Sequence, residues 1–140
     1  MPEISSSVEI KASPKIVYGI VTDFEKYPEF LPETKSVEIK KEGRSPQVRF
    51  QIQVIKTISY LLQFNLKPLT DVCWKLVEGD IFKRNSGFWK FEEVKKGVTK
   101  ATYSIDVDFG VLVPRMITHM LVGKSLPQML ERFKKRAEKL

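Results

Sequence analysis

The C-terminal stretch of the chain, residues 113–140, reads VPRMITHMLVGKSLPQMLERFKKRAEKL. Pro114 suits the first turn of a helix, and apolar residues, methionines among them, recur after it at helical spacing. We therefore predict one long amphipathic helix from about Val113 to Leu140. At about 1.5 Å per residue this helix is roughly 40 Å long, so it needs a broad, curved surface to bury its apolar side.

The segments before this helix supply such a surface, because most of them alternate apolar and polar residues as half-buried strands do. Ser13 and Pro14 instead suit the N-cap and first position of a short helix that ends near Asp23, and residues 24–32 predict a second short helix. Strands are predicted at 3–11, 36–41, 48–54, 57–67, 71–78, 81–84, 88–95 and 98–109, with turns at Asn85-Ser86-Gly87 and Lys95-Lys96-Gly97. This order predicts an α+β fold, in which a curved antiparallel sheet of about six to seven strands wraps around the long C-terminal helix.

Length and composition indicate one domain over residues 1–140, of ordinary globular type. No apolar run reaches the roughly 18 residues of a membrane helix, and the N-terminus lacks the pattern of a signal peptide, so we expect a cytoplasmic protein. Cys73 is the one cysteine and has no neighbouring metal-ligand pattern, so we expect a buried, inert thiol. We predict neither a metal nor a cofactor.

The net charge of +7 and the pI of 9.5 leave two interpretations open. A basic surface attracts acidic partners, so peripheral contact with an anionic membrane or a ribosome is one of them. An ordinary solvated face is the other, because the basic cluster of Lys134, Lys135, Arg136 and Lys139 also complements the helix dipole. The sequence does not fix the oligomeric state.

Three strings of residues resemble a known family. They are VYGIVTDFEKYPEFLP at 17–32, Trp74 with EGD at 78–80 and FWKF at 88–91, and Thr102 with IDVDF at 105–109. With the order of elements, they resemble the START/polyketide cyclase/Bet v 1-like (SRPBCC) superfamily over essentially the whole chain. The nearest group is the polyketide cyclase/dehydrase group, which includes coenzyme Q-binding proteins and ribosome-association toxins.

This resemblance implies a helix-grip fold with a hydrophobic cavity between the sheet and the C-terminal helix, holding a lipid, isoprenoid, polyketide or other apolar molecule. Read without the resemblance, the same apolar residues are those of an ordinary core. Pro127 either kinks the helix and leaves room for a ligand or follows the curvature of the sheet. The residues expected to line the cavity are Tyr27, Phe30, Leu31, Phe50, Ile52, Trp74, Trp89, Tyr103, Ile105, Met116, Ile117, Met120 and Leu121.

Catalysis has weaker support, and we predict no catalytic residue. Asp106 and Asp108 share a strand face and suit either a carboxylate pair, a calcium site or an exposed sheet surface. The sequence favours a non-catalytic binder or carrier of a hydrophobic small molecule, such as an isoprenoid quinone or lipid. A polyketide cyclase or dehydratase is the enzyme alternative, and a ribosome- or RNA-associated factor is the third. The enzyme alternative requires at least two polar residues to converge in the cavity, out of His119, Arg115, Tyr60 and Tyr103.

Overall fold

The computed structural model describes residues 4–53, 57–80, 82–108 and 126–139. Seven antiparallel strands form one sheet in the order β1-β7-β6-β5-β4-β3-β2. Within the described ranges three helices accompany them: α1 (Pro14–Thr22), the 3-10 helix η1 (Phe24–Glu29) and α3 (Leu126–Glu138). The strands are β1 (Ile4–Ile10), β2 (Thr34–Lys41), β3 (Gln47–Gln53), β4 (Thr57–Lys67), β5 (Asp71–Gly79), β6 (Arg84–Lys95) and β7 (Val98–Asp108).

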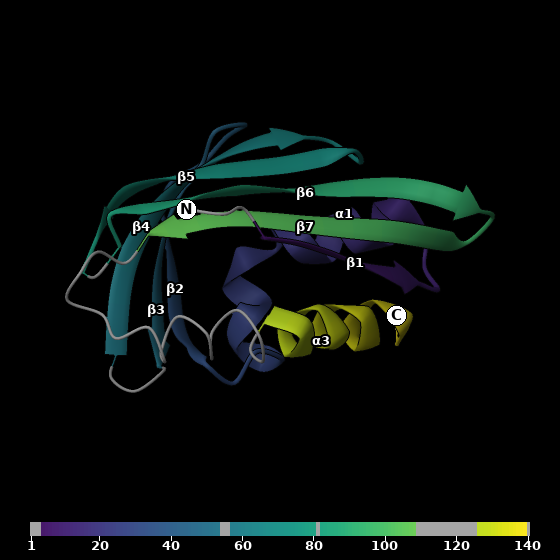
Figure 1. Cartoon of the computed structure of the whole chain (residues 1–140), viewed down its shortest axis with the longest axis horizontal. Helices are drawn as coiled ribbons and strands as arrows, with labels where there is room; N and C mark the ends of the chain where they lie inside the picture. Colours follow the sequence, from purple (N-terminus) through teal and green to yellow (C-terminus); the bar gives the residue numbers. More distant parts are fainter. Residues whose placement is uncertain (1–3, 54–56, 81, 109–125, 140) are drawn as a thin grey trace.

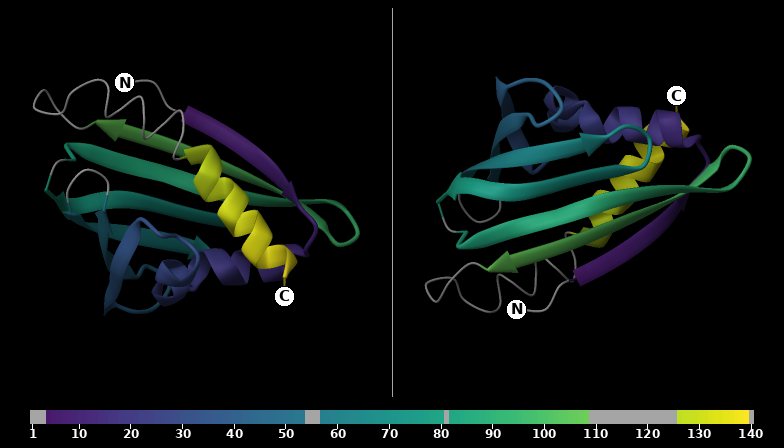
Figure 2. Two further views of the ribbon diagram at one scale, coloured as in Figure 1. Left: turned by 90° about the horizontal axis from the view of Figure 1, so that it is seen from below. Right: turned by 90° about the horizontal axis from the view of Figure 1, so that it is seen from above.

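The sheet is open and curved, and α3 lies against its concave side, as the sequence predicts (Figure 1). Both views in Figure 2 show α3 crossing the strands at an angle, close to α1. The face of α3 toward the sheet carries its buried residues, Leu126, Leu130, Phe133 and Ala137, at the spacing of one helical stripe. Burial of this stripe holds the helix on the sheet.

The start of α1 follows the predicted capping pattern. The side chain of Ser13 accepts a hydrogen bond from the backbone N–H of Ile16, and Pro14 occupies the first turn. Val17, Ile20 and Val21 then form the buried side of the helix. Capping and hydrophobic spacing together fix where this helix begins and which side it buries.

Two groups of polar contacts attach the C-terminal end of α3 to the rest of the molecule. Glu138 accepts a hydrogen bond from the backbone N–H of Lys11 at 2.8 Å and also pairs with Lys134. Arg136 pairs with Glu29 at 2.6 Å, and its guanidinium lies 5.2 Å from the ring centre of Phe30. These contacts tie the end of α3 to the connection before α1 and to η1.

The predicted turn at Asn85-Ser86-Gly87 is wrong, because these residues lie inside the continuous strand β6. Each of the two outer members has a long-range role there. Asn85 is buried and accepts a hydrogen bond from the indole N–H of Trp74 at 3.0 Å. A Cβ on Gly87 would lie 2.1 Å from the backbone oxygen of Ser104 and 2.7 Å from Cζ2 of Trp74, so the strands approach here too closely for any side chain. The separate strand predicted at 81–84 is also wrong in its described part, since Arg84 already begins β6.

The prediction for the long C-terminal helix is covered only in part. Residues 126–138 are helical, while residues 113–125 lie outside the described residues. Pro127 is the second residue of the described helix, so the predicted kink depends on a segment that also lies outside them.

Candidate functional site

A cavity of about 260 Å³ lies between the sheet and α3. Its walls come from η1, from strands β2 to β7 and from the first two turns of α3. On the strands, these residues occupy the alternate positions that point to the concave face. The cavity is lined by Tyr27, Leu31, Glu33, Thr34, Phe50, Ile52, Tyr60, Leu62, Phe64, Trp74, Phe82, Asn85, Trp89, Tyr103, Ile105, Val107, Leu126, Met129 and Phe133.

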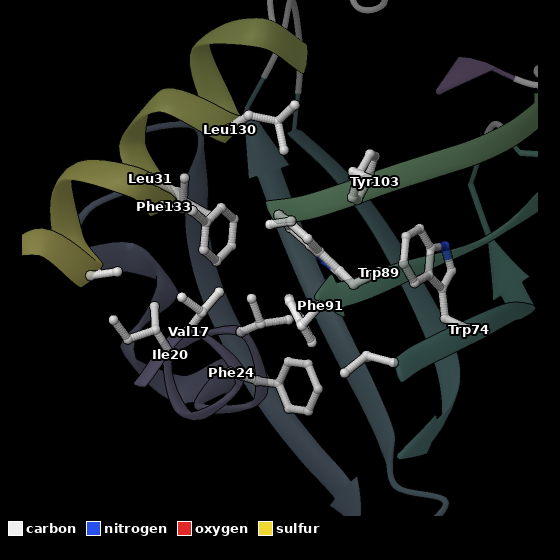
Figure 3. Packing of buried hydrophobic residues seen from close by; sticks show 14 of the residues in the cluster. Val17, Ile20, Phe24, Leu31, Trp74, Trp89, Phe91, Tyr103, Leu130 and Phe133 are labelled. Carbon is white, nitrogen blue, oxygen red and sulfur yellow. The ribbon is translucent and has the colours of Figure 1, made fainter. Parts of the chain in front are cut away.

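Aromatic rings dominate this lining and contact one another around the cavity. The ring centres of Trp89 and Tyr103 are 4.9 Å apart, and those of Trp74 and Tyr103 are 5.2 Å apart. Phe133 extends from α3 toward Trp89, with 5.1 Å between ring centres (Figure 3). Phe50 stacks on Tyr60 at 5.6 Å, as expected for cross-strand partners. Rings held in this way offer faces and edges to a flat ligand.

Trp74 is oriented by its neighbours. Its indole N–H is bound by Asn85, and Gly87 leaves the space that the six-membered part of the ring occupies. A tryptophan indole N–H can only donate, so the oxygen of the Asn85 amide must face Trp74. The amide nitrogen of Asn85, itself a cavity residue, therefore points elsewhere.

Three tyrosines border the cavity, and all three stay protonated. Burial raises the pKa of Tyr27, Tyr60 and Tyr103 well above the usual value, and the nearby Tyr60 raises that of Tyr103 further. The hydroxyl of Tyr27 donates to the backbone oxygen of Val21. Within the part of the chain that the structure describes, the hydroxyls of Tyr60 and Tyr103 have no hydrogen-bond partner. These two hydroxyls can donate hydrogen bonds to a bound molecule. Because they do not ionise near neutral pH, they cannot serve as bases.

Comparison with known families assigns the chain. A family model described as polyketide cyclase / dehydrase and lipid transport matches residues 10–134. The chain belongs to this family. Membership and fold together indicate either binding of a hydrophobic ligand or polyketide cyclase-like activity.

Known relatives of this family member share a modest level of identity with it. The ribosome association toxin RatA of Escherichia coli (strain K12) is 27% identical over 112 residues, which cover 78% of this chain and 70% of the relative. RatA of Vibrio cholerae serotype O1 is 22% identical over 143 residues, which cover 100% of this chain and 98% of the relative.

Solved structures of similar shape cover nearly the whole chain. A START superfamily protein from Mycobacterium smegmatis has a TM-score of 0.87 at 23% identity, covering 98% of this chain and 97% of its own. The Zhui aromatase/cyclase from Streptomyces sp. R1128 has a TM-score of 0.88 at 21% identity, with coverage of 99% and 94%. At these identities the likeness establishes the fold alone. It is the helix-grip fold that the family resemblance of the sequence implies.

In this polyketide cyclase/dehydrase family member, most of the residues expected from the sequence to contact a ligand do border the cavity. They are Tyr27, Leu31, Phe50, Ile52, Trp74, Trp89, Tyr103 and Ile105. Phe30 does not border it, because its ring packs on Phe133 at 5.0 Å and lies under the guanidinium of Arg136. Met116, Ile117, Met120 and Leu121 lie outside the described residues, as do His119 and Arg115.

Other residues of the wall were not expected from the sequence. Asn85 was predicted to lie in a turn, and Leu62 and Phe64 were predicted only as members of the strand at 57–67. Alternation along β4 places both on the concave face, but nothing in the pattern separates a cavity wall from solid packing. Phe133 and Met129 follow from the helical stripe of α3 in the same way.

The remaining polar candidates have structural roles among the described residues. Asp106 and Asp108 both pair with Arg84, at 2.9 Å and 4.0 Å, on the face of the sheet away from the cavity. No group of three or more potential metal ligands occurs in the described ranges, and Cys73 is half-buried rather than fully buried as expected. In the basic cluster of α3, Lys134 and Arg136 are paired with acids, whereas Lys135 and Lys139 are exposed.

Among the residues that the structure describes, no helix is both long enough and apolar enough to span a membrane.

Proposed function

We propose that the protein binds and carries a hydrophobic small molecule in the cavity between the sheet and α3. The observation that carries this proposal is the cavity of about 260 Å³ with its largely aromatic and aliphatic wall. Pockets that hold small ligands have this character, mainly apolar with a few placed polar groups. A ligand that buries roughly 200 Å² of apolar surface there gains about 5 kcal/mol before the costs of association.

The size and the rings of the cavity favour one kind of ligand. A volume of about 260 Å³ lies just below the usual range of roughly 300–1,000 Å³ for ligand pockets, so it suits a compact ring system or the end of a longer chain. The faces and edges of Trp74, Trp89 and Tyr103 favour a planar group over a branched aliphatic one. A quinone-like isoprenoid or a polyketide-like aromatic compound therefore fits better than a saturated lipid chain.

Native mass spectrometry of protein purified from its own cells without detergent, followed by organic extraction, tests this proposal. We expect one bound apolar molecule per chain. A matched pair of variants locates it. Ile105→Phe adds bulk to the wall of the cavity, whereas Val94→Phe adds a similar ring to an exposed site on β6. Ligand should be lost from the Ile105→Phe protein and kept by the Val94→Phe protein, with both melting near the parent temperature. Equal retention in both variants contradicts the proposal.

A polyketide cyclase-like activity is the second candidate, and the position of Tyr60 and Tyr103 in one cavity favours it. Both hydroxyls stay protonated, so they would act by donating hydrogen bonds to a carbonyl whose oxygen gains negative charge. The test is cyclisation of a synthetic poly-β-carbonyl thioester. Turnover that disappears in Tyr60→Phe and Tyr103→Phe while binding persists would favour the enzyme over the carrier.

Ribosome association, which the names of the RatA relatives state for those proteins, is the third candidate. The net charge of +7 favours it. Co-sedimentation with ribosomes that decreases steeply with added salt is the expected signature, because phosphate contacts release counterions. Absence of co-sedimentation at low salt removes this candidate.

A further inference from the structure

The turn between β4 and β5 presents an exposed leucine in an unfavourable backbone conformation. Leu69 follows Pro68, has a φ of 70° and is 45% exposed. The backbone N–H of Thr70 donates to the oxygen of Lys67 at 3.1 Å, which closes the turn. A proline followed by a residue with positive φ is the pattern of a type II turn, whose third residue is usually glycine. In the described ranges the other residues with positive φ are glycines, so Leu69 is the exception.

The side chain of Leu69 lowers the stability of the fold and is not buried in return. A positive φ places Cβ close to the following carbonyl oxygen, which disfavours leucine relative to glycine. Burial against the core could offset this cost, but Leu69 is not one of the hydrophobic residues that pack there. Strained residues of this kind occur where the side chain has a functional role. For an exposed leucine, that role is contact with another apolar surface.

Three other segments lie at the same end of the molecule as this turn. The backbone N–H of Phe91 on β6 donates to the oxygen of Thr70 at 2.9 Å, so the β4–β5 turn lies beside the last part of β6. The hydroxyl of Thr99, at the start of β7, donates to the backbone oxygen of Ala12 at 2.7 Å, which places the β6–β7 turn near the start of α1. The end of α3 is bonded to the same connection before α1. In the right-hand view of Figure 2 both turns and the end of α3 point to one side, which we call the hairpin end.

Exposed lysines collect at the hairpin end without acidic partners. They are Lys15, Lys67, Lys95, Lys96, Lys135 and Lys139. None of them forms an ion pair with a described residue, and Glu3 is the only acidic residue outside the described ranges. Glu9 and Glu92 are cross-strand neighbours of Lys100 and offset its charge instead. Glu93 is exposed before the β6–β7 turn and reduces the charge there without cancelling it.

Basic side chains in other parts of the surface are neutralised more often. Arg84 pairs with Asp106 and Asp108, and Arg49 pairs with Glu78. Much of the net charge of +7 is therefore located at the hairpin end. A surface of this kind attracts an acidic partner.

Apolar side chains project among these lysines and indicate which acidic partner fits. Of the three exposed large hydrophobic residues in the described ranges, Leu69 and Val94 lie at this end, and Val94 is 44% exposed. Leu69 is two residues from Lys67, and Val94 is next to Lys95. A bilayer of anionic lipids suits both features, because its headgroups attract lysines and its interface accepts apolar side chains. A nucleic acid would use the lysines but would leave Leu69 in water.

We propose that the hairpin end docks the protein on an anionic lipid bilayer, with Leu69 entering the bilayer surface and the lysines lying against the headgroups. Burial in the bilayer gives the side chain of Leu69 the apolar contact that the fold does not supply. The inference goes beyond the proposed carrier function, because it does not depend on what the cavity holds.

Sedimentation with lipid vesicles tests the proposal. Vesicles of phosphatidylcholine with about 30% phosphatidylglycerol supply the anionic surface, and pure phosphatidylcholine vesicles are the neutral comparison. We expect the parent protein to partition about tenfold or more strongly onto the anionic vesicles, and added salt should weaken this binding. Equal partitioning onto both kinds of vesicle, or none onto either, overturns the proposal.

Two matched pairs of variants locate the surface. Leu69→Ser should weaken binding to the anionic vesicles about tenfold, because it removes an inserted leucine. Val77→Ser is its control, since Val77 is 46% exposed but lies near the other end of β5. Lys95→Gln/Lys96→Gln should also weaken binding about tenfold or more. Its control is Lys75→Gln/Lys83→Gln, which removes the same charge from exposed lysines away from the hairpin end. Equal losses in a variant and its control contradict the assigned surface.

The stability of a third variant separates docking from a role in folding. Leu69→Gly releases the strain of the positive φ, so its urea midpoint should equal or exceed that of the parent while it binds vesicles as weakly as Leu69→Ser. A lower midpoint would give Leu69 a structural role and overturn the argument. Salt-sensitive binding of poly(U) RNA without binding of anionic vesicles would overturn it too, and assign a nucleic acid to this surface. None of these results bears on the ligand in the cavity, which native mass spectrometry tests separately.

Discussion

Gly87 is the position where one added methyl group should do the most damage. It lies on β6 opposite Ile105, and its hydrogen faces both the neighbouring backbone and the indole of Trp74. In Gly87→Ala the new Cβ would lie 2.1 Å from the oxygen of Ser104, 2.7 Å from Cζ2 of Trp74 and 3.1 Å from Cα of Ile105. Two of these three atoms belong to the backbone of β7, so no side-chain rotation relieves the contact.

The expected cost follows from that geometry. Overpacking a core commonly costs about 1–3 kcal/mol, and here β6 must separate from β7 or Trp74 must move and strain its bond to Asn85. We therefore expect a loss of about 3 kcal/mol or more in the free energy of unfolding. Gly19→Ala is the matched control, because Gly19 is on α1 and a Cβ there meets no atom within 4 Å. Alanine should stabilise that helix by roughly 0.5–1 kcal/mol.

Urea unfolding followed by circular dichroism measures both changes. With a slope of about 1–3 kcal/mol per molar urea, Gly87→Ala should lower the midpoint by about 1 M or more, and Gly19→Ala should raise it slightly. A Gly87→Ala protein within about 0.5 kcal/mol of the parent would refute the close approach described for β6, β7 and Trp74. Equal losses in both variants would point instead to a general effect of replacing glycine.

Three further predictions concern buried polar groups and the end of α3. Asn85→Leu should lower the free energy of unfolding by about 1–3 kcal/mol, because it leaves the indole N–H of Trp74 buried without an acceptor. In a double-mutant cycle with Trp74→Phe most of that loss should disappear. Simple additivity of the two changes would contradict the hydrogen bond. Burial raises the pKa of Tyr60 and Tyr103 above 10.0, so the folded state keeps protons that the unfolded chain loses, and stability should decrease as the pH rises above about 10. Tyr60→Phe/Tyr103→Phe should resist alkaline unfolding better than the parent, and tyrosinate absorbance from these residues before any change in circular dichroism would argue against their burial. The backbone N–H of Lys11 and the ammonium of Lys134 lower the pKa of Glu138 below 4.5, so the stability that Glu138 contributes is present above about pH 4.5 and is lost as the pH decreases further. Glu138→Gln should therefore be less stable than the parent at neutral pH and equal to it near pH 3. Unfolding curves at both pH values can check this.

The strands and the first helix were predictable because local rules determine them. Alternation defines the concave face of β3 and β7, Ser13 and Pro14 define the start of α1, and Gly97 supplies the positive φ of the turn between β6 and β7. The error at Asn85 and Gly87 has the opposite origin. Asparagine and glycine together are typical of turns. Here Asn85 hydrogen-bonds to Trp74 and Gly87 makes room for the backbone of Ser104, and the local sequence reveals neither of these contacts with other strands.

The cavity could be predicted only in outline. Phe50 and Val72 both occupy inward positions on their strands, and the sequence gives no reason to treat them differently. In the structure Phe50 borders the cavity, whereas Val72 is fully buried and does not. Phe30 shows the same limit, since its spacing beside Tyr27 suggested a cavity wall while Arg136 and Phe133 hold it outside. The position of the cavity depends on how α3 packs on the sheet, and this packing cannot be read from any single segment of the sequence.

The position of β1 has a consequence for how the chain acquires its fold. β1 pairs along its whole length with β7, so that Ile4 lies opposite Ile105 and Ile10 opposite Thr99. The strands β2 to β7 pair with sequence neighbours and can form hairpin by hairpin as they leave the ribosome, whereas β1 must wait until almost all of the sheet has been synthesised. We expect amide protons of β1 to become protected later than those of β3 and β4 in pulse-labelled hydrogen exchange, and simultaneous protection would contradict this order. During synthesis the first strand therefore stays unpaired the longest and is the segment most open to wrong pairing or to a chaperone.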